Sequence, residues 1–176
     1  MIHEMEGLKG MVLNNVRILA PHNRKDPYYT ELLRLADQPY FFETYQVIVW
    51  AGLHLQPKRI LEIGTRNGGS LVQLLSAYHR FDGVSAVCFD LWREIGSPRA
   101  VRANLQRLAI PDHLVEFVSG DSTQTVPAWR QRHPQARFDY VLVDGGHDVQ
   151  TASRDLQNVA GLVAPAEARP DRGGPQ

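Results

Sequence analysis

Short apolar runs alternate with amphipathic segments over most of the chain. After Pro57, four runs have the length and apolar character of β-strands, and each precedes a segment with apolar residues at helical spacing. The predicted strands cover residues 59–63, 84–89, 114–118 and 138–143, and the predicted helices cover 69–79, 97–109, 122–133 and 150–162. Strands that alternate with helices indicate an α/β fold with a doubly wound parallel sheet.

The segment before Pro57 is predicted to be helical. Residues 28–37 and 41–55 carry apolar side chains at helical spacing, and Pro57 ends that pattern. At 176 residues, the chain has the length of one domain with a sizeable core. We therefore expect an N-terminal helical segment over 1–55 and an α/β domain over 56–164.

Charge and composition exclude several classes of partner. The chain has 19 basic and 19 acidic side chains, so its net charge gives no attraction to nucleic acid or to an anionic membrane. The N-terminal residues have no secretory pattern, and no apolar run approaches the roughly 20 residues of a membrane span. Cys88 is the single cysteine, which excludes an internal disulfide and indicates a reducing, cytoplasmic location.

A carboxylate stands close to the end of each predicted strand. These residues are Glu62, Asp90, Asp121 and Asp144. Because right-handed crossovers gather the carboxyl ends of parallel strands at one edge, the four acids predict a polar small-molecule site there. For any one of them the alternative is a turn former or a helix N-cap.

A glycine-rich loop follows the first predicted strand, with the sequence E-I-G-T-R-N-G-G-S from Glu62. A dinucleotide fingerprint, G-x-G-x-x-G, needs a second glycine where this chain has Arg66. A P-loop needs a lysine after its last glycine, and none follows Gly69. Neither phosphate-binding motif is present.

The segment E-I-G-T-R-N-G, residues 62–68, resembles motif I of the class I S-adenosylmethionine (SAM)-dependent methyltransferases. The resemblance extends to Asp90, to G-D-S at 120–122 and to D-G-G-H at 144–147, and it covers residues 55–165. G-G-S and D-G-x-H are most similar to the small-molecule O-methyltransferase branch that includes cephalosporin-hydroxylase-like proteins. The resemblance implies a Rossmann-like fold and SAM-dependent methyl transfer to a small-molecule hydroxyl.

The resemblance also implies roles around the methionine part of the cofactor. Gly64 and Gly68 would leave room for the methionine moiety against the main chain. Glu62 would orient the loop and the methionine amino group. Arg66 replaces a commoner small residue, and we expect its side chain to point away from the ligand.

The nucleoside part of the cofactor has three implied partners. Asp90 would accept hydrogen bonds from the ribose hydroxyls, because a carboxylate accommodates two donors. Asp121 or Ser122 would meet the amino edge of the adenine. Any one of these motifs is short, so the specificity lies in their order along the chain.

Asp144 and His147 are the candidates for the reaction itself. In metal-using relatives the carboxylate after the fourth strand binds Mg²⁺, and a hard cation of this kind prefers oxygen ligands. His147 is the candidate general base that removes the proton of the acceptor hydroxyl. The alternative for His147 is a structural histidine at the start of a helix.

The chain departs from the family after Pro165. Residues 165–176 are charged and rich in Pro and Gly, so we expect a disordered tail, and strands five to seven of the usual sheet are absent. A truncated or frame-shifted methyltransferase gene would explain this ending. The fourth strand would then form an open edge through which the protein self-associates.

Two other functions stay open from the sequence. The first is a non-catalytic protein that binds SAM or self-associates along the fourth strand. The second is a Rossmann enzyme that uses NAD or a nucleotide sugar, which the glycine spacing disfavours.

Overall fold

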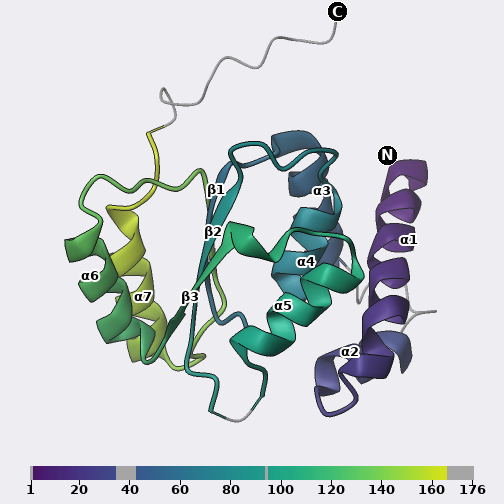
Figure 1. The fold of residues 1–176 in the computed structure, drawn as a ribbon, viewed down its shortest axis with the longest axis horizontal. Helices are drawn as coiled ribbons and strands as arrows, with labels where there is room; N and C mark the ends of the chain where they lie inside the picture. Colours follow the sequence, from purple (N-terminus) through teal and green to yellow (C-terminus); the bar gives the residue numbers. More distant parts are fainter. Residues whose placement is uncertain (1, 35–42, 94, 166–176) are drawn as a thin grey trace, which may run out of the picture.

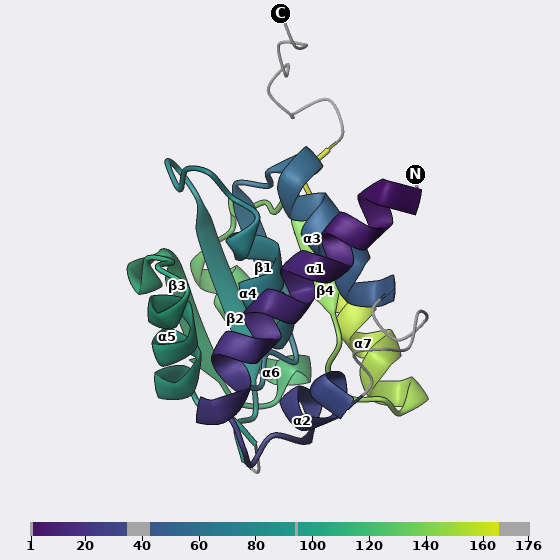
Figure 2. The ribbon, with the colours of Figure 1, turned by 90° about the vertical axis from the view of Figure 1, so that its right-hand side faces the viewer.

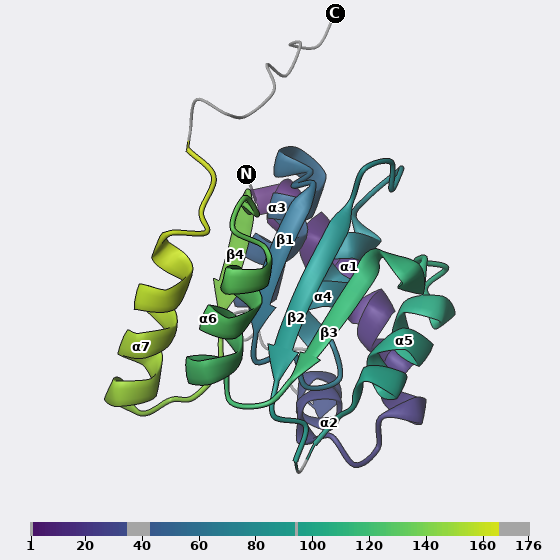
Figure 3. The ribbon, with the colours of Figure 1, turned by 60° about the vertical axis from the view of Figure 1, so that its left-hand side comes forward.

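The computed structural model describes residues 2–34, 43–93 and 95–165. Four parallel strands form its central sheet in the order β3-β2-β1-β4 (Figure 3). The strands are β1 (Arg59–Ile63), β2 (Ser85–Asp90), β3 (Val115–Ser119) and β4 (Tyr140–Val143). The predicted α/β fold and the predicted parallel sheet are both confirmed.

Helices cover both faces of this sheet (Figure 1). On one face lie α3, α4 and α5, with α1 packed outside them, and on the other face lie α6 and α7 (Figures 1 and 2). Their bounds are α1 (Ile2–Leu19), α2 (Pro27–Arg34), α3 (Glu43–Leu55), α4 (Gly69–Ser76), α5 (Pro98–Arg107), α6 (Ser122–Arg132) and α7 (Val149–Ala160). Within the described residues, none of these helices is long and apolar enough to cross a membrane.

Two apolar cores lie on opposite sides of the sheet, because successive side chains of a strand point to opposite faces. Ile60 contributes to the larger core, which also contains buried residues of α1, α3, α4 and α5. Leu61 and Ile63 contribute to the second core beneath α6 and α7. The side chain of Glu62 therefore lies on the same side of β1 as Ile60, toward α4.

Local contacts explain where the observed elements differ from the predicted ones. The helix predicted over 69–79 ends at Ser76, and the Tyr78 hydroxyl then donates a 2.6 Å hydrogen bond to the Pro57 carbonyl. The start predicted for α5 is confirmed, since Ser97 caps the helix by accepting from the Ala100 amide at 3.1 Å.

The first helix, α1, is an element that its own pattern did not predict. Its core residues are Leu8, Val12, Val16 and Leu19, which are all buried. They form a narrow stripe of one residue per turn, and the residues between them include Gly10, Asn14 and Asn15. The residues predicted as helix at 35–37 and 41–42 lie outside the described part of the chain.

The outer edge of β4 is partly covered. Phe138, predicted as the start of the fourth strand, instead forms an isolated parallel bridge with Val163 beyond α7. The Phe138 amide donates to the Leu162 carbonyl at 2.8 Å, and the Ala164 amide donates to the Phe138 carbonyl at 2.8 Å. β4 is the edge strand of the described sheet, as the sequence predicts. The tail predicted to be disordered lies outside the described residues from 166 onward.

Candidate active site at the carboxyl edge of the sheet

The four strand ends meet at one edge of the sheet. Three main-chain hydrogen bonds extend the ladders beyond the strands: Gly64 N to Phe89 O at 2.9 Å, Asp144 N to Ile63 O at 2.8 Å and Gly120 N to Asp90 O at 2.9 Å. The loops after all four strands therefore start at the same height along the strand direction. The sequence prediction that the strand-end acids share an edge is consistent with this register.

The glycine loop is held by the protein's own backbone. Gly64 has a φ of +90°, and a Cβ at this position would overlap the Asp144 carbonyl. Gly68 has a φ of +79°, and a Cβ there would lie 2.9 Å from Cγ1 of Val101 in α5. Glycine is thus required by neighbouring protein atoms at both positions. Their role against a methionine moiety stays a prediction.

Asp90 ties two loops of this edge together. Its Oδ2 accepts from the Arg66 amide at 2.7 Å, and its Oδ1 accepts from the Trp92 amide at 2.7 Å. The Trp92 indole N–H also donates to the Arg66 carbonyl at 2.9 Å. This geometry fits the turn-forming alternative for Asp90. A carboxylate has about four lone-pair sites, so each oxygen keeps capacity for one further donor.

Glu62 is a buried acid beneath the glycine loop. Its side chain faces an apolar space that Ile60, Leu71, Leu74 and Leu142 help to line. The pKa of Glu62 is raised to about 8, mainly by burial and also by the carboxylates of Asp144 and Asp90, while the nearby hydroxyls of Thr65 and Ser70 oppose the shift. At neutral pH the Glu62 carboxyl is therefore mainly protonated.

Asp121 acts as the N-cap of α6. Its Oδ1 accepts from the Thr123 amide at 2.9 Å and from the Thr123 hydroxyl at 2.7 Å, and these bonds lower the pKa of Asp121. The carboxylate is exposed at the edge of the sheet, whereas the neighbouring Ser122 is half-buried. The N-cap alternative thus applies to Asp121, and its role toward adenine stays a prediction.

Asp144 and His147 lie on the loop between β4 and α7, and both side chains are exposed. Asp148, not His147, caps α7, because its Oδ1 accepts from the Thr151 amide at 2.9 Å. His147 makes no hydrogen bond with the described residues. In the same part of the chain, no three His, Cys, Asp or Glu side chains are grouped so that they could hold a metal ion.

A polar network between the N-terminal segment and the glycine loop was not predicted. The Arg66 guanidinium donates to Oδ1 of Asp26 at 2.9 Å, and the Asn67 side chain donates to Oδ2 of Asp26 at 2.9 Å. Arg66 therefore points toward the N-terminal segment. Asn104 of α5 exchanges side-chain hydrogen bonds with Asn23 at 3.0 and 3.2 Å. Nothing in the residue spacing indicates that positions 23–26 contact position 66.

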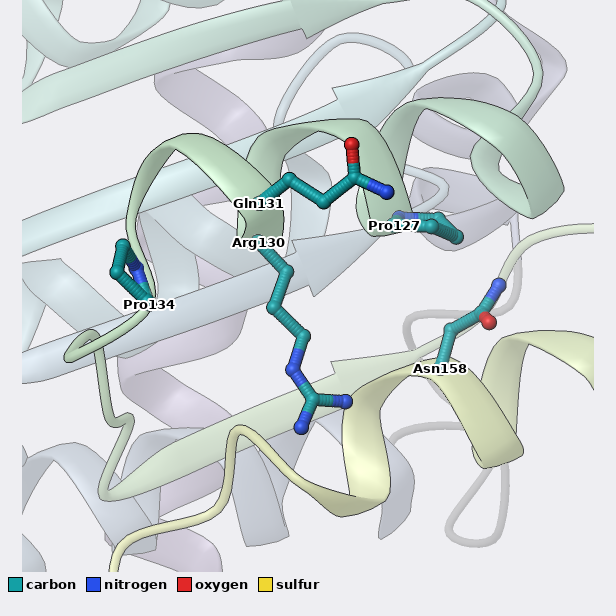
Figure 4. A pocket seen from close by; sticks show the side chains of 5 residues that line it. All are labelled: Pro127, Arg130, Gln131, Pro134 and Asn158. Atoms are coloured by element: carbon teal, nitrogen blue, oxygen red, sulfur yellow. The ribbon is translucent and has the colours of Figure 1, made fainter.

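The surface has two cavities, of which one borders this region. One of about 440 Å³ lies between residues 21–26, the glycine loop and the start of α5. The other, of about 400 Å³, lies between α6 and α7, where Arg130 and Asn158 extend from the two helices (Figure 4). None of the strand-end acids lines the second cavity.

Comparison with known protein families shows which family the chain belongs to. A family model described as a methyltransferase domain matches residues 61–166, which is more than half of the 176 residues. The chain belongs to the methyltransferase-domain family. The matched region of this methyltransferase-domain chain contains the glycine loop and all four strand-end acids, so the predicted membership is confirmed. No curated protein has a significant sequence match to the chain.

Solved structures of methyltransferases share the fold. The O-methyltransferase TomG from Streptomyces achromogenes, in complex with SAM, is 26% identical with a TM-score of 0.53, and the match covers 69% of this chain and 51% of TomG. SAH-bound PaMTH1 from Podospora anserina is 19% identical with a TM-score of 0.57, over 88% of this chain and 58% of that one. The O-methyltransferase from Bacillus cereus, in complex with SAH, is 20% identical with a TM-score of 0.56. The match covers 85% of this chain and 71% of that one. The chain thus spans between half and three-fifths of TomG and PaMTH1.

Proposed function

We propose that this protein binds SAM at the carboxyl edge of its sheet and transfers the methyl group to a hydroxyl of a small molecule. The observation that carries the proposal is the family match over residues 61–166, which contains every loop of that edge. The likeness to TomG, an O-methyltransferase solved in complex with SAM, supports the same cofactor and the same class of acceptor. Because the match is to part of TomG, activity and acceptor remain proposals.

The hydrogen-bond acceptors of the edge fit the donor groups of this cofactor. Asp90 has free acceptor capacity on each oxygen and would bind the ribose hydroxyls. Glu62 lies beneath the glycine loop, where an approaching ammonium would favour loss of its proton and make it an anionic partner for the methionine amino group. Asp121 or Ser122, at the start of α6, would accept from the adenine amino group. The sulfonium of the bound cofactor supplies an activated methyl group.

The remaining requirement is alignment and proton removal at the acceptor. Methyl transfer from a sulfonium is an in-line displacement, so the site must align the acceptor oxygen with the methyl carbon and exclude water. His147 is exposed and unbonded among the described residues, so a ring nitrogen is available to take the hydroxyl proton. Asp144, three residues earlier, would orient the acceptor.

A magnesium ion is not needed for this scheme. The sequence suggests Asp144 as a ligand, but the described residues offer no group of three side chains around a cation. A methyl-transfer assay in chelator compared with Mg²⁺ separates the two cases, and loss of turnover in chelator would restore Asp144 as a metal ligand.

Calorimetric titration of the wild-type protein tests the cofactor. We expect binding of SAM and S-adenosylhomocysteine but not of NAD, and the Asp90→Ala variant should bind SAM about 10–100-fold more weakly, because hydrogen bonds to a charged group are lost. Asp82→Ala is the matched control, since Asp82 is exposed on a remote turn. Binding of NAD in place of SAM would contradict the proposed function.

The open part of the β4 edge supports a further proposal, that two copies of the chain pair along it. Among the described residues, the bridge to Val163 covers only Phe138, and β4 has a strand neighbour on one side only. Light scattering over a range of protein concentrations should give the mass of a dimer. A monomeric mass at every concentration would exclude pairing along β4.

A further inference from the structure

Asp155 is a buried carboxyl on α7 that the proposed mechanism does not use. Its side chain is 0% exposed, and neither carboxyl oxygen has a hydrogen-bond partner in the described part of the chain. Burial raises the pKa of Asp155, and the carboxylates of Asp121 and Asp148 raise it further. The nearby Ser122 hydroxyl lowers the pKa of Asp155 and so opposes this shift, but it forms no hydrogen bond with either carboxyl oxygen. Asp155 therefore has unused hydrogen-bonding capacity in a dry environment.

The loop that carries Asp144 and His147 rests directly on this carboxyl. A Cβ at Gly145 would lie 3.1 Å from Oδ2 of Asp155 and 2.9 Å from Cγ2 of Ile63. A Cβ at Gly146 would lie 2.9 Å from Cβ of Thr151, one turn earlier on α7 than Asp155. The two glycines thus let the loop approach α7 more closely than residues with side chains could.

Hydrogen bonds hold the two ends of the loop but not its centre. At one end the Asp144 amide donates to the Ile63 carbonyl at 2.8 Å, and at the other end Asp148 caps α7. Between them, the amides of Gly145 and Gly146 make no hydrogen bond with the described residues. The main chain of Gly145 therefore lies next to an unpaired buried acceptor, and Gly146 follows it directly on the exposed side of the loop.

A buried carboxyl without a partner lowers stability, and an apolar side chain of similar size would pack without that loss. We propose that Asp155 is a positioning residue, whose carboxyl binds the amides of Gly145 and Gly146 when ligands fill the carboxyl edge and so fixes the placement of Asp144 and His147. The inference rests on the proposed function, because it assigns Asp155 to the same site. Asp155 touches neither cofactor nor acceptor in this scheme and acts through the loop.

Two substitutions separate positioning from a structural role. Asp155→Leu removes the polar atoms and keeps the branched shape in a larger side chain, whereas Asp155→Asn keeps one side-chain oxygen that can accept from an amide. We expect Asp155→Leu to raise the Tm by about 2–4 °C. Its kcat should fall about 10–100-fold because the reacting groups are misplaced. Its KM for SAM should stay within about twofold, and Asp155→Asn should recover most of kcat.

Amide exchange followed by NMR gives a readout that does not depend on turnover. S-adenosylhomocysteine should slow exchange at Gly145 and Gly146 in the wild type and in Asp155→Asn, but not in Asp155→Leu. Leu156→Gln, at an exposed position of the same helix, is the matched control and should behave as the wild type.

Two results would overturn the inference in different ways. If the wild type binds S-adenosylhomocysteine without slower exchange at these glycines, or if Asp155→Leu keeps full kcat, Asp155 does not position the loop. If the wild type does not bind S-adenosylhomocysteine, the proposed function fails first and the inference falls with it.

Discussion

Replacing Gly64 with alanine is expected to lower the free energy of unfolding by about 3–5 kcal/mol and to abolish SAM binding. The main chain at Gly64 has a φ of +90°, which is unfavourable for alanine, and the new Cβ would overlap the carbonyl of Asp144. The two strands that directly precede these residues are paired, so neither segment can move away without disturbing the β1–β4 ladder. Urea denaturation, with cofactor titration on the same samples, measures both effects.

Gly83→Ala is the matched control for this substitution. Gly83 also has a positive φ, +69°, but a Cβ added there would have no atom within 4 Å apart from its chain neighbours. This variant should lose only about 1–2 kcal/mol, the cost of the backbone conformation alone. Equal losses at the two positions would show that the contact with Asp144 contributes nothing.

The stability of the protein should fall as pH rises because of Glu62. The pKa of Glu62 is about 8 in the folded protein and 4.5 in its unperturbed state, with burial as the main cause. Between these values the folded state holds a proton that the unfolded state has lost. The stabilisation from this group is complete below pH 4.5 and is lost as pH rises through 8, at up to about 1.4 kcal/mol per pH unit.

Glu62→Gln provides the measurement, because glutamine keeps the shape and cannot ionise. Unfolding by urea at several pH values should give equal stabilities near pH 5 and a growing advantage of Glu62→Gln toward pH 8. Other groups with shifted pKa values, including Asp121 and Asp155, cancel in this comparison. Parallel pH profiles for the two proteins would mean that Glu62 is ionised in the fold.

The strands and the helix starts of the α/β domain could be predicted because they depend on local signals. β1 matches its apolar run over residues 59–63. α5 begins where Ser97 and Pro98 favour an N-terminus. The strand-end acids could be placed on one edge because parallel topology leaves no other arrangement.

The contacts that define the site could not be predicted, because they join positions far apart in the chain. Gly64 was attributed to ligand approach, whereas the structure places the Asp144 carbonyl where its side chain would be. Asp26 pairs with Arg66, 40 residues away, without any sequence pattern that indicates it. Asp155 lies in a segment for which the sequence predicts only a helix, and its burial follows from how α7 lies against the loop after β4.

The central position of β2 gives the protein an intrinsic probe of its own unfolding. Cys88, the one thiol of the sequence, is 0% exposed in the larger core, and burial raises the pKa of this thiol well above its ordinary value. A thiol reagent can reach its Sγ only after the helices on that face separate from the sheet. The rate of labelling in native buffer therefore reports how often the core opens, with no added fluorophore and no engineered cysteine.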